Sequence, residues 1–162
     1  MTTSVYLGLG TNLGDRNANL KAAIQSITAG SQLLSCSPVY QTKPWGYSDQ
    51  PDFYNQVIKV QTSLTPLDLL ENVKSIELAI GRQPSFRYGP RLIDIDILLF
   101  GTVILDTPSL SIPHPRLIER AFMLIPLLEL DPELVHPVTG VPFAQYLAKI
   151  DRTGTIRLPE EE

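Results

Sequence analysis

The chain has 162 residues, of which 43% are hydrophobic and 19% charged, and its net charge is −4 at pH 7. This length and composition predict one globular domain, residues 1–162, and exclude disordered and fibrous classes. The acidic balance argues against a nucleic-acid-binding protein, and no segment is long and apolar enough to span a membrane. The single cysteine, Cys36, fits a cytoplasmic protein, and we expect it to be a small buried side chain.

The first part of the chain alternates between strand and helix patterns. Apolar residues at every second position from Val5 to Leu9 predict a strand that ends near Gly10. After a polar turn over residues 11–15, apolar residues at helical spacing predict a helix that ends at Gly30. Residues 33–42 and 53–62 have the character of extended chain, and we expect two further strands there.

The best-defined element is a helix that begins after Thr65. This residue offers an N-cap hydroxyl, Pro66 occupies the first helical position, and Asp68 stands three residues after the cap. Gly81 ends the helix. Its buried stripe is predicted to consist of Leu69, Val73, Ile76 and Ile80.

A last strand over residues 94–100 completes the order strand, helix, strand, strand, helix, strand. This is the order of the ferredoxin-like βαββαβ core, an α+β fold in which two helices cover one face of a mainly antiparallel sheet. The remaining residues predict a C-terminal extension. It comprises a short strand over 103–105, a helix over 120–130 that Pro126 should kink, a short helix from Pro142, and a flexible tail over 155–162.

Two acids, Asp94 and Asp96, stand two residues apart in this last, very apolar strand. Side chains alternate between the faces of a strand, so both acids should share one face. The other face is predicted to carry Ile93, Ile95, Ile97 and Leu99. Adjacent carboxylates repel each other and resist desolvation unless positive charge lies between them. A hard divalent cation would supply it, and magnesium is typically held by one or two carboxylates plus substrate phosphates.

An acid pair of this kind can also be the solvated face of a half-buried strand. Here four cations precede it within a short span: Lys74, Arg82, Arg87 and Arg91. We therefore favour a site for a phosphate-bearing substrate, with residues 82–90 as a cationic lid. Residues 112–116 are by default a rigid turn, but they can also bring His114 and Arg116 to the same anion.

The long connection over residues 42–52 holds the only tryptophan, Trp45. It is equally compatible with a lid on the core and with a loop that binds a flat heterocycle, helped by Phe53 and Asn55. The amide of Asn55 both donates and accepts, which matches a ring edge that carries both kinds of group. The glycines of residues 8–14 have the wrong spacing for a dinucleotide fingerprint or a P-loop, and we reject both.

The segment Arg-Tyr-Gly-Pro-Arg-Leu-Ile-Asp-Ile-Asp at residues 87–96 is accompanied by further motifs in fixed order. These lie at residues 8–14, 40–42, 50–55, 77–82, 112–116 and 120–123. Together they resemble the hydroxymethyldihydropterin pyrophosphokinase family of folate synthesis over residues 4–150. The residues Phe53, Lys74 and Tyr88 depart from those of some members, which leaves the loop contacts open.

The resemblance implies magnesium-dependent transfer of diphosphate from ATP to 6-hydroxymethyl-7,8-dihydropterin, with release of AMP. It implies that Asp94 and Asp96 hold two Mg²⁺ ions and that Arg82 and Arg91 steady the phosphates. For ATP the implied residues are Glu77, Arg87, Ile97, Ser111, His114, Arg116 and Arg120. For the pterin they are Thr42, Pro44, Trp45, Phe53, Asn55, Tyr88 and Phe122. The implied protein is a cytoplasmic monomer that can associate with other folate-pathway enzymes.

Two other functions compete with this one. Another magnesium-dependent nucleotidyl- or phosphotransferase on the same fold is the closer alternative. An RNA-recognition module has the same order of elements, and the aromatic Tyr6 lies where its first strand carries one. The third strand lacks the matching basic-aromatic motif, however, and the chain is acidic, so we rank this alternative lower.

Overall fold

The computed structural model describes residues 1–44, 49–81 and 92–160. The elements follow in the order β1 (Thr3–Thr11), α1 (Arg16–Thr28), β2 (Gln32–Cys36), β3 (Tyr40–Thr42), β4 (Phe53–Thr62), α2 (Pro66–Ile80), β5 (Asp94–Phe100), β6 (Leu105–Asp106), β7 (Ser111–Ile112), a 3₁₀ helix (Leu117–Glu119), α3 (Ala121–Leu130), α4 (Phe143–Leu147) and β8 (Ile156–Arg157). None of the described helices is long and apolar enough to cross a bilayer.

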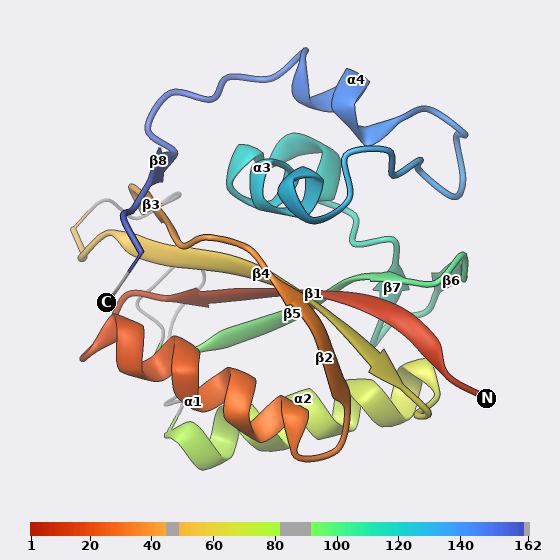
Figure 1. The fold of residues 1–162 in the computed structure, drawn as a ribbon, viewed down its shortest axis with the longest axis horizontal. Coiled ribbons are helices and arrows are strands. Elements are labelled where there is room, and N and C mark those ends of the chain that lie inside the picture. The colour runs from red at the N-terminus through yellow and green to blue at the C-terminus, as the bar shows by residue number, and fades with distance from the viewer. Residues whose placement is uncertain (45–48, 82–91, 161–162) are drawn as a thin grey trace.

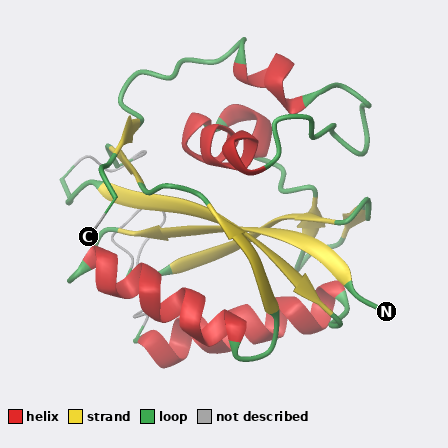
Figure 2. Ribbon diagram, viewed as in Figure 1, coloured by secondary structure: helices red, strands yellow, loops and turns green. Residues whose placement is uncertain are grey.

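The main sheet has the strand order β5-β1-β4-β3-β8, with β2 also paired to β4. All of these pairings are antiparallel. Helices α1 and α2 cover one face of the sheet, whereas α3 and α4 lie over the other (Figures 1 and 2). The predicted ferredoxin-like α+β fold is confirmed, and the C-terminal extension adds a third layer.

The predicted helix signals act as expected in α2. The hydroxyl of Thr65 accepts a hydrogen bond from the Asp68 amide at 3.2 Å, and Gly81 ends the helix in the left-handed region at φ 107°. Helix α1 is capped by Asp15, whose carboxylate accepts from the Ala18 amide at 3.1 Å. It ends at Thr28, before Gly30, because Ala29 closes the last turn in ordinary right-handed geometry.

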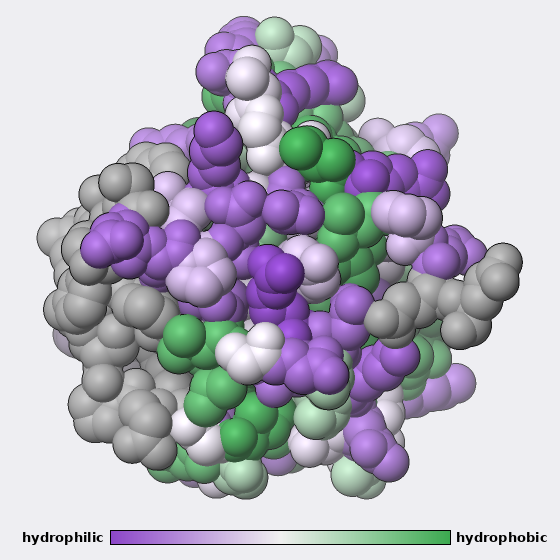
Figure 3. Space-filling model, turned by 90° about the vertical axis from the view of Figure 1, so that its left-hand side faces the viewer, coloured by the Kyte–Doolittle hydropathy of each residue, from purple (hydrophilic) through white to green (hydrophobic). Residues whose placement is uncertain are grey.

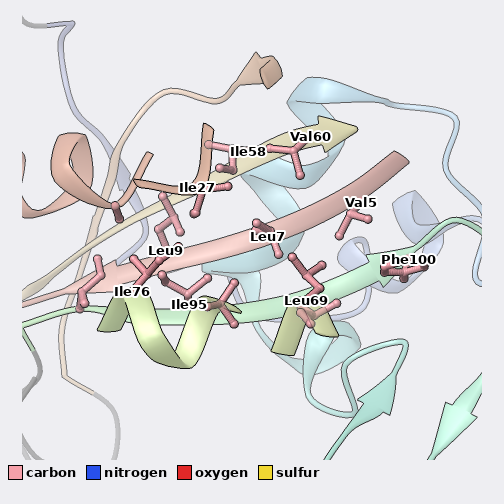
Figure 4. Close-up of a cluster of buried hydrophobic side chains, with 14 of the residues drawn as sticks. Val5, Leu7, Leu9, Ile27, Ile58, Val60, Leu69, Ile76, Ile95 and Phe100 are labelled. Atoms are coloured by element: carbon pink, nitrogen blue, oxygen red, sulfur yellow. The ribbon is translucent and has the colours of Figure 1, made fainter. Parts of the chain in front are cut away.

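Two clusters of buried side chains lie on the two faces of the sheet. The larger cluster joins β1, β4 and β5 to α1 and α2, and Figure 4 shows Leu7 on β1 between Ile58 of β4 and Leu69 of α2. The second cluster lies under α3 and α4 and includes Leu98, Leu124 and Phe143. Burying both faces accounts for the very apolar sequence of the central strands.

Strand β5 departs from simple alternation at Leu98. Its register with β1 shifts there, because Tyr6 pairs with Leu99 and Leu7 pairs with Ile97. A bulge of this kind inserts one extra residue and changes the face of those that follow. The prediction that Leu99 shares a face with Ile97 is therefore wrong, and Leu99 lies in the second cluster instead.

Several other expectations need correction. The extended run over residues 33–42 is two strands, β2 and β3, and Cys36 is exposed because β2 pairs only with β4 along its described length. The strand expected at 103–105 lies at Leu105–Asp106. Within residues 155–162, Ile156 and Arg157 form β8 and pair with β3. Tyr6 is only 6% exposed beneath the third layer, so this face of the sheet is not the open surface that an RNA-recognition module needs.

Candidate functional site

A cleft of about 190 Å³ opens on the sheet face that α3 partly covers. The described residues that line it are Gly8, Leu9, Gly10, Thr42, Lys43, Phe53, Asn55, Gln56, Val57, Asp94, Asp96, Arg120, Phe122 and Met123. They come from β1, β3, β4, β5 and the start of α3. Seen from the end of the molecule where β3 and β4 begin, the described surface is mainly hydrophilic, with small hydrophobic groups between (Figure 3).

The two aspartates lie side by side in this cleft, as predicted. Asp94 and Asp96 are both half-buried, and the residue between them, Ile95, points into the core on the other face. Across the ladder Asp94 pairs with Gly10 and Asp96 pairs with Gly8. Since glycine carries no side chain, the space above β1 stays open beside both carboxylates.

The opposite part of the cleft carries amide and aromatic groups. Asn55 is only 7% exposed, and its Nδ2 donates to the hydroxyl of Thr42 at 2.8 Å. This bond fixes the orientation of the Asn55 amide. Phe53 and Phe122 add two aromatic rings to the lining. Four of the residues predicted for the pterin thus lie together.

Lys43 and Arg120 are the cations among the described residues of the lining. Lys43 is exposed, and Arg120 is half-buried at the start of α3, with its guanidinium carbon 5.7 Å from the centre of the Phe122 ring. The positive end of α3 lies at the same place, since Arg120 is its N-cap residue. The surroundings of this part of the cleft therefore favour an anion.

His114 and Arg116 lie beyond the outer edge of β5 and do not line the cleft. The His114 amide donates to the carbonyl of Leu98 at 2.9 Å, and its Nδ1 accepts from the Arg116 amide at 3.1 Å. Burial and the charges of Arg120 and Arg116 lower the pKa of His114 to about 4. The ring is thus neutral at pH 7, with its remaining proton on Nε2.

Glu77 takes a place that the sequence did not predict. It is 1% exposed and reaches β5 from α2, on the face of the sheet opposite the cleft. Its Oε2 accepts from the Ile95 amide at 3.0 Å, and its Oε1 lies 3.2 Å from the Lys74 ammonium. Glu77 therefore lies behind the strand that carries the acids and outside the lining of the cleft.

Three other predicted residues also lie outside the cleft lining. Ile97 packs in the larger core cluster, Ser111 lies on β7 and donates to Asp106 at 3.2 Å, and Pro44 follows β3. Five more fall outside the described residues. These are Arg82, Arg87, Arg91, Tyr88 and Trp45.

Sequence reasoning missed several residues of the lining. The local pattern predicts that Gly10 ends a strand, whereas its place opposite Asp94 follows from strand pairing that no local pattern reveals. Lys43 and Met123 adjoin predicted residues, so their position along the chain was the available signal. Gln56 and Val57 carried no distinguishing signal, because they read as ordinary strand residues.

The carboxylates of the cleft have the character of a partial metal site. Among residues 1–44, 49–81 and 92–160, no group of three or more histidine, cysteine or acidic side chains forms a complete metal cage. Two adjacent carboxylates in a cleft suit a cation that completes its shell with water and substrate oxygens, which is typical of Mg²⁺. The donor set therefore fits magnesium better than a structural zinc ion.

The sequence matches the family model of 7,8-dihydro-6-hydroxymethylpterin-pyrophosphokinase (HPPK) over residues 6–132. The Pneumocystis carinii folic acid synthesis protein fol1 is 47% identical over 148 residues, which are 91% of this chain and 20% of that protein. The 2-amino-4-hydroxy-6-hydroxymethyldihydropteridine pyrophosphokinase of Aquifex aeolicus is 42% identical and matches 88% of this chain over 89% of its own length. The Pseudomonas aeruginosa enzyme of the same name is 42% identical over 98% of this chain and 99% of its own.

Solved structures agree in fold. A crystal structure of Plasmodium falciparum HPPK-DHPS aligns with a TM-score of 0.73 at 21% identity, over 92% of this chain and 44% of that one. The family match covers every described residue of the cleft lining. The chain therefore belongs to the HPPK family, the pyrophosphokinases of folate synthesis.

Proposed function

We propose that the cleft binds ATP with Mg²⁺ beside 6-hydroxymethyl-7,8-dihydropterin and transfers the terminal diphosphate of ATP to the pterin hydroxymethyl group. The observation that carries the proposal is the joining of two chemistries in one cleft. The acid pair Asp94 and Asp96 forms one part, and the aromatic and amide group of Asn55 and Phe122 forms another. Each part suits one substrate.

The pterin is assigned to the part near β3 and β4. A flat heterocycle stacks well on aromatic rings, which Phe53 and Phe122 provide. The Asn55 amide is fixed by Thr42, so its oxygen is available to accept from a ring N–H. Few convergent polar groups in a largely apolar pocket are the usual basis of such specificity.

The ATP is assigned to the acid pair and to the outer edge of β5. Asp94 and Asp96 would hold Mg²⁺ against the phosphates, and bound Mg²⁺ would neutralise charge on the transferred group. Arg120 and the N-terminus of α3 favour the same anion. The neutral His114 can donate from Nε2 to an acceptor on the nucleotide.

Diphosphate transfer asks mainly for alignment and charge stabilisation. The pterin hydroxyl oxygen forms a bond to the β-phosphorus, while the bond from that phosphorus to the α,β-bridging oxygen breaks and AMP leaves. The hydroxyl proton must depart during this step. Among the described residues of the lining, Asp94 and Asp96 are the carboxylates close to that path.

The longer relatives support one further proposal about partners. The chain spans 20% of fol1 and 44% of the Plasmodium HPPK-DHPS chain, so in those proteins the domain is joined to other parts. We propose that this protein associates with other enzymes of folate synthesis.

Product analysis tests the reaction. Incubation with ATP, Mg²⁺ and 6-hydroxymethyl-7,8-dihydropterin is expected to yield AMP and the pterin diphosphate. Release of ADP would instead indicate transfer of a single phosphoryl group, and release of free pyrophosphate would indicate nucleotidyl transfer. Either product would overturn the proposal.

The role of the acid pair is tested by Asp96→Ala. Loss of one preorganised electrostatic group is expected to lower kcat by ~10²–10³-fold. The far-UV circular dichroism spectrum should stay that of the wild type, because Asp96 is half-buried at an open cleft and not part of either core cluster. Unchanged turnover would show that this acid is only a solvated residue.

A further inference from the structure

Strand β5 is the edge strand of the main sheet, and the acids lie on it. In an antiparallel pair, successive residues direct their backbone groups alternately toward the partner strand and away from it. The Ile95 amide is one of the groups that points away from β1, since it donates to Glu77 at 3.0 Å. Ile95 is also the residue between Asp94 and Asp96.

Glu77 is built to hold this amide. Its side chain is 1% exposed, and the ammonium of Lys74 lies 3.2 Å from Oε1, which offsets the cost of burying the carboxylate. Oε2 is directed at the Ile95 amide from the well-capped helix α2. A charged acceptor makes this hydrogen bond stronger than one between neutral groups.

We propose that Glu77 is a positioning residue that acts through the Ile95 amide and keeps Asp94 and Asp96 at the spacing and angle that Mg²⁺ and the phosphates require. This inference rests on the proposed function of the cleft. Magnesium demands near-ideal octahedral geometry, so small shifts of its carboxylates weaken binding. On its outer side β5 has no paired strand in the main sheet as described, so single contacts hold it there: the His114 amide to the Leu98 carbonyl at one end and Glu77 to the Ile95 amide between the two acids.

The geometry assigns Glu77 this indirect role and not a direct contact with the nucleotide. Its carboxylate lies on the α2 side of the sheet, whereas both aspartates face the cleft on the α3 side. Its side chain is only 1% exposed and is already engaged by the Ile95 amide and Lys74. Supporting groups behind metal-binding carboxylates commonly matter ten- to a hundredfold for metal affinity.

The test compares four variants by hydrogen exchange and ligand affinity, with the melting temperature as a measure of stability. The variants are Glu77→Ala, Glu77→Gln, Lys74→Ala and Val73→Ala. The first measurement is hydrogen exchange of the Ile95 amide by NMR, and the second is calorimetric affinity for α,β-methylene-ATP in the presence of Mg²⁺. Val73→Ala is the stability control, because Val73 is fully buried on α2 and belongs to the core cluster.

Glu77→Ala is expected to speed exchange at Ile95 and to weaken binding of the Mg²⁺ analogue by at least ~10-fold. Glu77→Gln keeps an oxygen acceptor and should recover most of this loss. Lys74→Ala should change affinity less than ~3-fold, since the ammonium is half exposed and pairs with Oε1 of Glu77, not with the Oε2 that holds the Ile95 amide. Val73→Ala should lower the melting temperature without lowering affinity.

Three outcomes would overturn the inference. One is that Glu77→Ala speeds exchange at Ile95 but leaves the affinity for the analogue unchanged. Another is that Val73→Ala loses as much affinity for the analogue as Glu77→Ala does. A third is that Glu77→Gln binds the analogue as weakly as Glu77→Ala does, because this would show that the charge of the carboxylate, and not its hydrogen bond to Ile95, supports binding. If Glu77→Ala does not fold, Glu77→Gln decides: any faster exchange at Ile95 must be accompanied by weaker binding of the analogue, and faster exchange with unchanged affinity would overturn the inference. If the wild type fails to bind the analogue, the proposed function of the cleft fails instead.

Discussion

At the scale of single residues, Gly8 and Gly10 determine how closely a ligand can approach β1. A β-carbon at Gly10 would lie 3.3 Å from Oδ1 of Asn55, closer than most such contacts, whereas the nearest atoms to one at Gly8 belong to the Leu98 side chain, at 3.4–3.5 Å. Asn55 is buried and bonded to Thr42, so it has little freedom to move away. Gly10 thus preserves the group assigned to reading the pterin.

We expect Gly10→Ala to raise the KM for the pterin by ~10-fold, which corresponds to the loss of about one hydrogen bond. The KM for ATP should change much less. Steady-state kinetics with each substrate varied in turn measures both. Gly8→Ala is the matched control on the same strand and face, and its pterin KM should rise by less than ~3-fold. Equal effects of the two substitutions would show that Asn55 is not the affected group.

His114 gives the stability of the protein a defined pH dependence. Burial and the charges of Arg120 and Arg116 hold its pKa at about 4, below the usual 6.5. Between these two pH values the unfolded chain binds a proton that the folded chain excludes, so the free energy of unfolding rises with pH through this window. The size of the shift corresponds to roughly 3 kcal/mol across the window.

His114→Gln removes this titration. Urea unfolding at pH 4.5 and pH 6.5 should show a loss of stability at the lower pH that is ~2–3 kcal/mol larger in the wild type than in the variant. Carboxylates also titrate here, but they do so in both proteins and cancel in the comparison. The same pH dependence in both proteins would contradict a neutral, buried His114.

At the scale of elements, the far end of α3 is tied to the sheet. The Tyr6 hydroxyl donates to Oδ2 of Asp131, which ends α3, and the Lys59 ammonium lies 2.9 Å from the same oxygen. Burial alone would raise the pKa of Asp131, but the bonds from Tyr6 and Lys59 outweigh it and lower the pKa. Because Phe122 lies at the other end of α3, this tie also orients one wall of the cleft.

A double-mutant cycle measures the energy of the interaction between Tyr6 and Asp131. Tyr6→Phe removes only the hydroxyl, Asp131→Ala removes the acceptor, and urea unfolding of both single variants and the double variant gives the coupling energy. We expect ~0.5–1.5 kcal/mol, since the carboxylate is partly exposed and water weakens the interaction. A coupling energy near zero would show that the contact adds no stability.

At the scale of the whole molecule, the sequence predicted what local patterns determine. The caps of α2, the alternation in β1 and β4, and the shared face of Asp94 and Asp96 depend on neighbours along the chain. The bulge at Leu98, the exposed Cys36 and the place of Glu77 could not be predicted. Each depends on which segment packs behind a strand, and that is determined by contacts far apart in sequence.

The division of the cleft into two parts predicts two separable gains in thermal stability. With Mg²⁺, α,β-methylene-ATP at a hundred times its Kd should stabilise the fold by ~2.7 kcal/mol, or about 5–10 °C in Tm for a chain of this size. EDTA should abolish this rise, and so should Asp94→Asn, because both remove the link between protein and phosphates. Adding the pterin to the nucleotide-bound protein should raise the Tm again.

Phe122→Ala separates the two gains. It removes an aromatic ring from the cleft but leaves both carboxylates, so it should keep the nucleotide-dependent rise and lose most of the pterin-dependent one. Differential scanning fluorimetry of the three proteins measures each rise. A nucleotide-dependent rise that persists in EDTA would separate the acid pair from metal binding. Loss of both rises in Phe122→Ala would mean that the two ligands share one part of the cleft and that the division is wrong.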